Sequence, residues 1–253
     1  MRFPLPRWLA RAHPPVAPVA PFRAVGDIHG RADLLARVLD RPGPPLVCVG
    51  DYIDRGPDSA GVLRMLAARP DITCLMGNHE EMLLAFLDAP DLAGPRWLHN
   101  GGVETLASFG ISPAPGPQSV SALTEAAETL RAAMGEILLD WLRNLPSIWR
   151  SGNVAVVHAG ADPARPLDAQ TPETLHWGHP SFPGRRRRDA AWIVHGHVIV
   201  PEPRIQDGVV SIDTGAWATD RLTIVHVSIG GDIQFETAKP SFSTVSHAKH
   251  AQT

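Results

Sequence analysis

Short hydrophobic runs, polar turns and helical segments follow one another in a repeating order along the first third of the chain. The run that begins at Phe22 leads through a glycine-bounded turn into 31–40, where apolar residues recur at helical spacing. The same order is seen at 44–69 and at 72–89. Strands that alternate with helices predict a parallel or mixed sheet covered by helices, with ligands bound at the carboxyl ends of the strands.

The pattern changes in the middle of the chain. Residues 121–145 have helical periodicity and lack a strand signal, which predicts a helical insertion over about 94–148. Four β-branched runs follow it, at 153–160, 190–200, 208–216 and 221–229. We expect these later strands to form a second sheet.

No linker rich enough in Gly, Pro or Ser separates the predicted elements into independent units. We therefore expect a single domain over 22–237. We expect residues 1–21 to be a Pro-rich irregular N-terminal tail, because their prolines interrupt the apolar stretch that a signal peptide needs. Residues 238–253 are expected to be a loosely ordered C-terminal tail.

Composition narrows the class of protein. The 253 residues are 44% hydrophobic and 19% charged, with a formal net charge of −3, which argues against a nucleic-acid or membrane-surface partner. No run approaches the ~20 apolar residues that cross a bilayer. Cys48 and Cys74 lie inside apolar runs and imply no disulfide framework, so we expect a cytoplasmic, reducing location.

Residues able to bind metal follow five predicted strands. They are Asp27 with His29, Asp51, Asn78 with His79, His158, and His195 with His197. The shared topology is expected to bring these loops together at one end of the sheet. Carboxylate, imidazole and amide oxygen suit manganese, iron or zinc, and the absence of a thiolate argues against a structural zinc site. In an extended turn, residues at i and i+2 point the same way, so Asp27 and His29 can reach one ion.

A histidine at a strand end is more often a hydrogen-bonded surface or core residue than a metal ligand. That interpretation holds for any one of these histidines taken alone. It accounts poorly for five loops that all combine polar residues with flanking glycines, because core packing does not produce that recurrence. The set as a whole favours a common site.

Five segments carry a resemblance to a known family: "GDIHG", "GDYIDRG", "GNHE", "HAG" and "HGH". In this order they resemble the signature segments of phosphoprotein phosphatases within the calcineurin-like metallophosphoesterases, and above all those of the small bacterial and phage serine/threonine phosphatases. The resemblance covers about 22–227. It implies an α/β fold of two packed mixed β-sheets, a β-sandwich flanked by helices, and an active site with two metal ions.

The resemblance also implies a role for each ligand. Asp27 and His29 would hold the first metal, Asp51 would bridge both, and the second metal would be held by Asn78, His158 and His197. His195 is the alternative to His197, which we favour because a glycine directly precedes the ligand in the family. The cofactors implied are two divalent ions, with manganese as the first choice and iron or zinc as alternatives. Water shared between them loses a proton near neutral pH and attacks phosphorus in line.

The family resemblance gives further roles to the "GDYIDRG" and "GNHE" segments. His79 would be the general acid for the departing alkoxide, Asp54 would orient it, and Arg55 would hold the phosphate. In the alternative interpretation, Asp54 and Arg55 form a local ion pair that stabilises the turn at Gly56.

One departure from the family affects substrate binding. The family commonly has an arginine two residues after a tryptophan, and here His179 stands at that position after Trp177. Either His179 binds phosphate, or an arginine of 185–188, with Arg185 as our candidate, reaches into the site. A basic loop in solvent is the commoner meaning of such a run. The segment 97–110 resembles one common in the bacterial branch, and we expect a glycine-hinged loop beside the cleft.

The resemblance implies a phosphomonoester hydrolase that acts on serine or threonine phosphate in proteins or peptides, with tyrosine phosphate and small phosphoesters as further substrates. The rival is a symmetrical bis(5′-nucleosyl)-tetraphosphatase, which shares the metal motifs but usually carries a small apolar residue where this chain has Asp54. A non-catalytic metal-bearing binding protein is disfavoured, because every expected ligand and the acid are present. Oligomeric state is not predicted.

Overall fold

The computed structural model describes residues 13–112 and 118–240. Most of the two expected tails, residues 1–12 and 241–253, lies outside these ranges. Residues 13–21 have no regular secondary structure but pack against the body of the protein. Val16 is buried, and the Ala17 amide donates to Asn153 Oδ1 at 2.7 Å.

The first sheet has the strand order β10-β9-β1-β2-β3. Its strands are β1 (Phe22–Val25), β2 (Leu46–Cys48), β3 (Thr73–Cys74), β9 (Leu222–Val227) and β10 (Ile233–Ala238). β1, β2 and β3 are parallel, as the repeated strand–turn–helix order predicts, while β9 and β10 are antiparallel to their neighbours.

The second sheet has the order β4-β5-β6-β8-β7. Its strands are β4 (Ile148–Ser151), β5 (Val154–Val157), β6 (Trp192–His195), β7 (Arg204–Gln206) and β8 (Val209–Ser211). The expected second sheet is present, but the assignment of all later strands to it is wrong, because β9 returns to pair with β1. The hydrophobic pattern predicts that a segment is a strand, but it does not predict which other strand it pairs with.

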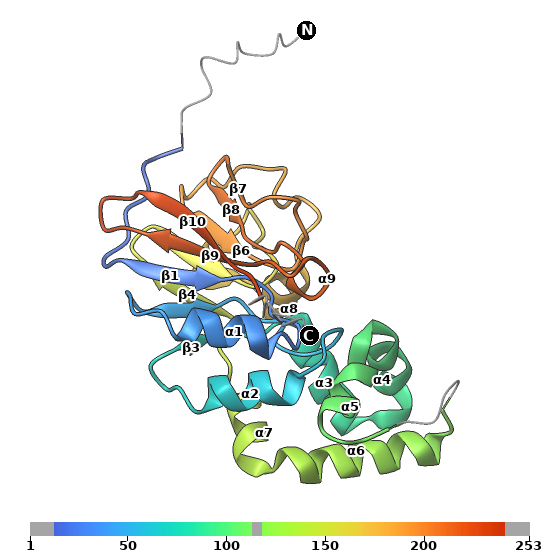
Figure 1. The fold of residues 1–253 in the computed structure, drawn as a ribbon. Coiled ribbons are helices and arrows are strands. Elements are labelled where there is room, and N and C mark those ends of the chain that lie inside the picture. The colour runs from blue at the N-terminus through green and yellow to red at the C-terminus, as the bar shows by residue number, and fades with distance from the viewer. Residues whose placement is uncertain (1–12, 113–117, 241–253) are drawn as a thin grey trace, which may run out of the picture.

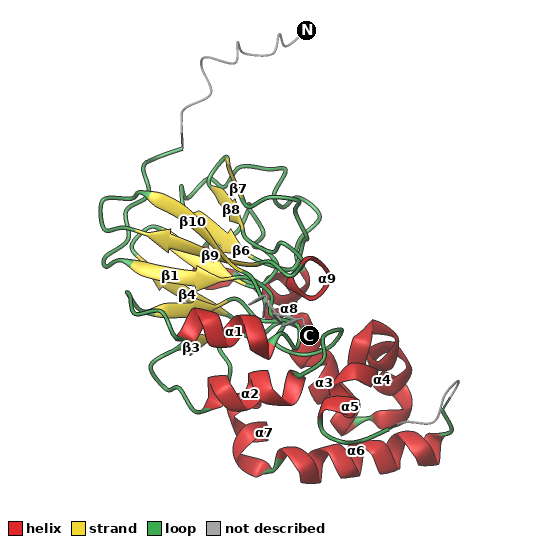
Figure 2. Cartoon of the chain, viewed as in Figure 1, coloured by secondary structure: helices red, strands yellow, loops and turns green. Residues whose placement is uncertain are grey.

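The two sheets pack face to face around a core drawn from both. Alternate residues of β1, Phe22 and Ala24, point into this core together with Val154 and Val156 of β5. Val25 points to the opposite face, where helices cover the first sheet. Figures 1 and 2 show the strands in one half of the molecule and most of the helices in the other.

The helices follow from local sequence. They are α1 (Ala32–Leu39), α2 (Ser59–Ala67), α3 (Asn78–Asp88), α4 (Pro90–Trp97), α5 (Val103–Ser108), α6 (Val120–Met134), α7 (Glu136–Arg143), α8 (Pro172–Trp177) and α9 (Ala216–Thr219). α1 buries Leu34, Leu35 and Val38 on one face. Asp58 caps α2 by accepting from the Gly61 amide at 2.8 Å, and Ser119 caps α6 in the same way.

The segment 97–110 differs from the expected glycine-hinged loop. α4 continues through a π-helical turn (Leu98–Gly102) into α5, so most of the segment is helical. The glycines still matter, because Gly101 has φ 109° inside the π-helical turn. Buried Trp97, Thr105 and Leu106 hold the helical form against the neighbouring helices. None of the helices in the described ranges is long and apolar enough to cross a membrane.

Candidate metal centre

Asp51 lies at the centre of the predicted ligands, three residues beyond the end of β2. Its Oδ2 is 3.5 Å from His29 Nε2 and 3.8 Å from His79 Nε2, and its Oδ1 is 3.3 Å from His158 Nε2. Two groups of potential ligand atoms therefore share this carboxylate: His29, Asp51 and His79, and Asp51, His158 and His197. A shared carboxylate is the arrangement that two neighbouring cations require.

The rings of His29 and His158 are oriented by backbone carbonyls. His29 Nδ1 lies 2.7 Å from the Ile53 carbonyl oxygen, and His158 Nδ1 lies 3.2 Å from the Val49 carbonyl oxygen. A carbonyl can only accept, so each Nδ1 carries the proton and donates it. Burial lowers the pKa of both rings to about 3, so both are neutral and Nε2 presents a lone pair.

The remaining predicted ligands come from the first, third and sixth strands. Asp27 follows β1, and its Oδ2 accepts from the His197 amide at 2.9 Å. Asn78 begins α3, and its Oδ1 is 2.9 Å from His158 Nε2 and 2.8 Å from His197 Nδ1. All six residues predicted to bind metal therefore lie in one connected cluster.

The structure separates the two histidines of "HGH". His195 Nε2 is 2.9 Å from Ser211 Oγ, and its ring packs against Phe182. It forms part of the second sheet, whereas His197 joins the ligand cluster. His197, the residue favoured from the sequence, is the one of the two that lies in the cluster, and its role as a ligand stays a prediction. Gly196 between them has no room for a side chain, because a Cβ there would lie 1.9 Å from Asp27 Oδ1.

These residues fit a cation on two grounds. Asp27 Oδ1 is buried and has no hydrogen-bond partner among the described residues, which is costly unless a cation binds it. The unprotonated Nε2 of His158 faces the oxygens of Asp51 and Asn78, so three acceptors meet without a donor between them. A divalent ion ligated by nitrogen and oxygen satisfies all of them at once.

Burial and neighbouring groups shift the pKa values of Asp27 and Asp51 in opposite directions. Burial, followed by the charges of Asp213 and Asp51, raises the pKa of Asp27 well above its usual range. Burial also raises the pKa of Asp51, but the nearby rings of His158, His79 and His29 lower it by more, so that its net pKa is below the usual value. Asp51 is therefore the anion around which the site is organised.

Asp54 and His79 form a hydrogen-bonded pair beside the cluster. Asp54 Oδ2 accepts from His79 Nδ1 at 2.6 Å, and Asp54 is completely buried. Burial lowers the pKa of His79, but the charges of Asp51 and Asp54 and the hydrogen bond raise it by more, so the net pKa is raised. An imidazole that holds its proton near neutral pH suits a general acid.

Two residues that sequence reasoning missed hold Asp54. Trp97 Nε1 donates to its two oxygens at 3.1 and 3.2 Å, and Thr105 Oγ1 donates to Oδ1 at 2.6 Å. The only sequence signal for them was the resemblance of 97–110 to a family segment, which does not reveal a contact with Asp54. Trp97 at the end of α4 and Thr105 in α5 are brought to Asp54 by tertiary packing.

Glu80 is the other residue that was missed. Its carboxylate accepts from the backbone amides of Asp51, Tyr52 and Gly77 at 2.8 to 3.1 Å, and it is fully buried. Glu80 therefore ties the loop after β2 to the start of α3. Burial and the charge of Asp51 raise the pKa of Glu80 to about 8. The sequence signal that could have pointed to Glu80 is its position as the last residue of the "GNHE" segment.

Arg55 turns its guanidinium toward the cluster. Its two terminal nitrogens lie 3.1 Å from His29 Nε2 and 3.0 Å from His79 Nε2. The oxygens of Asp54 are occupied by His79, Trp97 and Thr105, so the alternative of a turn-stabilising pair with Arg55 is not what the structure contains.

Backbone strain is concentrated at this site. Positive φ occurs at His29 (44°), Asp51 (53°), Asp54 (70°), Arg55 (66°) and His197 (63°). A positive φ costs energy in a residue with a side chain, and such residues cluster where function fixes the geometry.

The candidate substrate contacts are less well defined. His179 Nδ1 accepts from the Ser181 amide at 3.2 Å, its Nε2 is 3.8 Å from Asp162 Oδ2, and Arg185 is exposed. The ligand groups include neither residue. Arg187 is buried and donates to Asp189 and to two carbonyls, so it stabilises the loop. A phosphate role for His179 or Arg185 stays a prediction.

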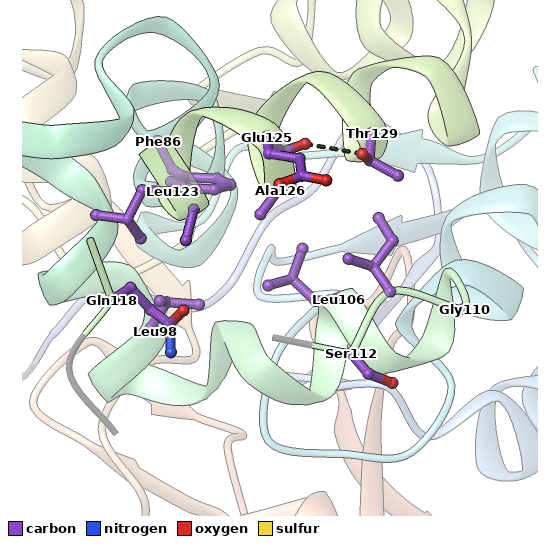
Figure 3. A pocket seen from close by; sticks show the side chains of 12 residues that line it. Phe86, Leu98, Leu106, Gly110, Ser112, Gln118, Leu123, Glu125, Ala126 and Thr129 are labelled. Carbon is purple, nitrogen blue, oxygen red and sulfur yellow. Dashed lines mark hydrogen bonds between the residues drawn. The ribbon is translucent and has the colours of Figure 1, made fainter. Parts of the chain in front are cut away.

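A cavity of about 420 Å³ lies away from this centre, among the inserted helices. Figure 3 shows Leu123, Ala126 and Thr129 of α6 facing Leu106 of α5 across it. Its lining is mainly apolar and contains none of the candidate metal ligands. One wall residue, Phe86, stacks on Trp97 with ring centroids 4.6 Å apart, and Trp97 in turn donates to Asp54 beside the strand-end cluster.

Two kinds of phosphatase are similar to this chain in sequence. Over 83 residues, 31% of this chain and 37% of the relative, the sequence is 45% identical to serine/threonine-protein phosphatase 2 of Escherichia coli (strain K12). It is 26% identical to the asymmetrical bis(5′-nucleosyl)-tetraphosphatase PrpE of Bacillus subtilis (strain 168), over 86% of this chain and 98% of that protein.

A solved structure described as a putative diadenosine tetraphosphatase shares the fold. Its TM-score is 0.60 at 24% identity, covering 90% of this chain and 99% of that one. Residues 20–208 match the family model described as calcineurin-like phosphoesterase. Together with the two packed mixed sheets and the strand-end cluster, this match establishes that the chain belongs to the calcineurin-like phosphoesterase family and is a hydrolase.

Proposed function

We propose that this protein is a metal-dependent phosphomonoesterase that removes phosphate from serine and threonine side chains of proteins or peptides. The observation that carries the proposal is the contact of Asp54 with His79, at 2.6 Å. His79 Nε2 also lies 3.8 Å from Asp51, the carboxylate shared by the two groups of potential ligand atoms. A serine alkoxide is a poor leaving group, so an acid placed at this position accelerates its departure.

The proposed ligands are the six residues of the cluster. Asp27 and His29 would hold one ion, Asn78, His158 and His197 would hold the other, and Asp51 would be shared by both. When bound, two divalent cations, with Mn²⁺ as the first candidate and iron or zinc as alternatives, supply charge neutralisation for the phosphoryl oxygens and lower the pKa of water so that it can attack phosphorus.

The protein's own residues perform three tasks. Arg55 binds the phosphoryl oxygens with its planar fork of donors. His79 donates the proton on Nε2 to the ester oxygen as the bond to phosphorus breaks. Asp54, which accepts from Nδ1, fixes the ring and favours the protonated form. Trp97 and Thr105 in turn fix Asp54.

A second candidate function is hydrolysis of bis(5′-nucleosyl) tetraphosphates. It is favoured by the similarity to PrpE, which extends over 98% of that relative, whereas the similarity to the serine/threonine phosphatase covers 37% of that protein. We prefer the protein phosphatase for two reasons. The match to the serine/threonine phosphatase, although shorter, has the higher identity, 45% against 26%. The buried Asp54 accepts a hydrogen bond from His79, the proposed general acid for a poor leaving group. We include a cytoplasmic location in the proposal, supported by two free, buried thiols.

The experiment compares hydrolysis of a phosphoserine peptide, p-nitrophenyl phosphate and diadenosine tetraphosphate by the same Mn²⁺-supplied protein. A chelated sample and Asp51→Asn serve as controls. We expect release of inorganic phosphate from the peptide, and loss of that activity in both controls. Faster turnover of diadenosine tetraphosphate, with little phosphate release from the peptide, would replace the proposal by the second candidate.

A further inference from the structure

Trp217 is an exposed aromatic residue next to the proposed phosphate ligand. It keeps 40% of its surface accessible, and the Arg55 guanidinium carbon lies 5.7 Å from the centroid of its ring. Exposed tryptophan is uncommon, because burying a large aromatic surface is strongly favourable. A ring held in solvent beside the phosphate-binding guanidinium is placed to contact whatever group the phosphate is attached to.

The short helix that carries Trp217 is firmly anchored. The buried Arg31 donates to the Ala216 carbonyl at 2.9 Å and to Asp220 Oδ1 at 2.5 Å. Two other nitrogens of Arg31 donate to the carboxylate of Asp33, which holds the guanidinium in place. Thr219 Oγ1 donates to the Gly215 carbonyl at 3.0 Å. α9 is thus fixed to the loop that carries His29, and the backbone of Trp217 is in place before a ligand arrives.

Two further apolar side chains are exposed on the segment that packs against the start of α9. Val198 and Ile199, directly after the proposed ligand His197, are 51% and 50% exposed. Ile199 packs over Gly215 at the start of α9, since a Cβ on that glycine would lie 3.3 Å from Ile199 Cγ2. The aromatic ring and the two aliphatic residues form what we call the apolar shelf: Val198, Ile199 and Trp217.

We propose that the apolar shelf gives the enzyme a further class of substrate beside phosphoserine and phosphothreonine: aryl phosphates, whose planar aromatic ring binds to the shelf with Trp217 as its main contact. The inference rests on the proposed function, because it takes Arg55 as the phosphate ligand. Stacking on an indole suits an aromatic ring, and the side chains of the shelf offer no acceptor to read hydrogen-bonding groups.

The competing explanation is structural: Trp217 would only hold Arg55 in place through its contact with the guanidinium. The two explanations differ in what they predict for a ligand that has a phosphonate but no ring. Loss of the shelf affects only ligands with an aromatic group, whereas a displaced Arg55 affects every phosphate-like ligand equally.

The test measures binding of phenylphosphonate and methylphosphonate to the Mn²⁺-supplied protein by calorimetry, so that turnover is not needed. We expect the intact protein to prefer phenylphosphonate. Trp217→Ala should weaken phenylphosphonate binding about tenfold and leave methylphosphonate within about twofold. Trp217→Phe should restore most of the difference. Ile229→Ala, which removes an apolar residue that is 67% exposed in the turn between β9 and β10, is the matched control and should change neither affinity.

Equal weakening of both phosphonates in Trp217→Ala would overturn the shelf and show that the ring only positions Arg55. Equal binding of the two phosphonates by the intact protein would overturn it as well. Hydrolysis is then compared for phenyl phosphate and methyl phosphate, with a rise in KM and little change in kcat expected for the aryl ester in Trp217→Ala. Selective phosphonate binding without hydrolysis of any ester would refute the proposed function while the shelf stands.

Discussion

At the scale of single residues, the proposed function depends on where Asp54 and His79 keep a proton. Asp54 is fully buried, and its carboxylate accepts from His79, Trp97 and Thr105. These donors compensate the buried charge, and against the effect of burial the charges of Asp51 and Asp54 raise the pKa of the imidazole. Such a pair is of most value when the leaving group cannot depart unaided.

His79→Asn should therefore slow the reaction in proportion to the basicity of the leaving group. For a phosphoserine peptide we expect kcat to fall by roughly 10²–10⁴, the usual contribution of a general acid. For p-nitrophenyl phosphate, whose leaving group needs little protonation, we expect about tenfold or less. Steady-state kinetics on both substrates decides the matter, and equal losses would remove His79 from the role of acid.

Arg55 is expected to bind phosphate by charge-assisted hydrogen bonds. A hydrogen bond to a charged group is worth about 1.5–3 kcal/mol, so Arg55→Ala should raise the inhibition constant for inorganic phosphate roughly 10- to 150-fold. Arg69→Ala, which removes an arginine paired with Asp71 on the surface, is the control and should have no effect. Unchanged inhibition in Arg55→Ala would exclude the arginine from the phosphate site.

At the scale of elements, α5 and the π-helical turn connect the inserted helices to the proposed catalytic pair, Asp54 and His79. The Arg55 amide donates to the Gly101 carbonyl at 3.3 Å, and Thr105 of α5 contacts Asp54. The insertion therefore contributes to the active site through positioning, although none of the proposed metal ligands lies on it. The strained backbone at Asp54 and Arg55 is held in place by this contact.

Thr105→Val tests this contribution, because it keeps the shape of the side chain and removes the donor to Asp54. We expect kcat for the phosphoserine peptide to fall about tenfold and the free energy of unfolding to fall by about 1–3 kcal/mol, the cost of an unsatisfied buried acceptor. Thr129→Val, which removes an exposed hydroxyl that donates within α6, is the matched control. A Thr105→Val protein with normal kcat would show that Asp54 needs no support from α5.

At the scale of the whole molecule, several buried carboxylates lie close together at the candidate metal centre, and their burial lowers the stability of the folded protein. Asp27, Asp51, Glu80 and Asp213 are each at most 3% exposed. Burial and mutual repulsion raise the pKa values of Asp27 and Glu80, so the repulsion is a cost to the folded protein. Cations that bind the folded form relieve this cost and stabilise it.

Supplying Mn²⁺ should therefore raise the melting temperature. Saturation to about 100 times the dissociation constant corresponds to ~2.7 kcal/mol, or about 5–10 °C for a chain of this size. Differential scanning fluorimetry with Mn²⁺ or with a chelator measures the shift, and Asp51→Asn should lose most of it. A full shift in the Asp51→Asn protein would place the stabilising ion elsewhere.

The sequence determined the local elements of the core and the identity of the ligand loops. Strand–turn–helix repeats are encoded by neighbouring residues. The glycines and polar residues of "GDIHG", "GDYIDRG" and "GNHE" mark turns that follow predicted strands. Parallel strands place their carboxyl ends at one edge, so convergence of Asp27, Asp51 and Asn78 could be predicted from topology alone.

Only the tertiary structure decided the contacts between segments distant in sequence. It placed β9 beside β1, oriented His197 rather than His195 toward the cluster, brought Trp97 and Thr105 to Asp54, and set Trp217 next to Arg55. The physical reason is that periodicity reports which face of an element is buried, while the choice of neighbour depends on packing and hydrogen bonding summed over the whole fold.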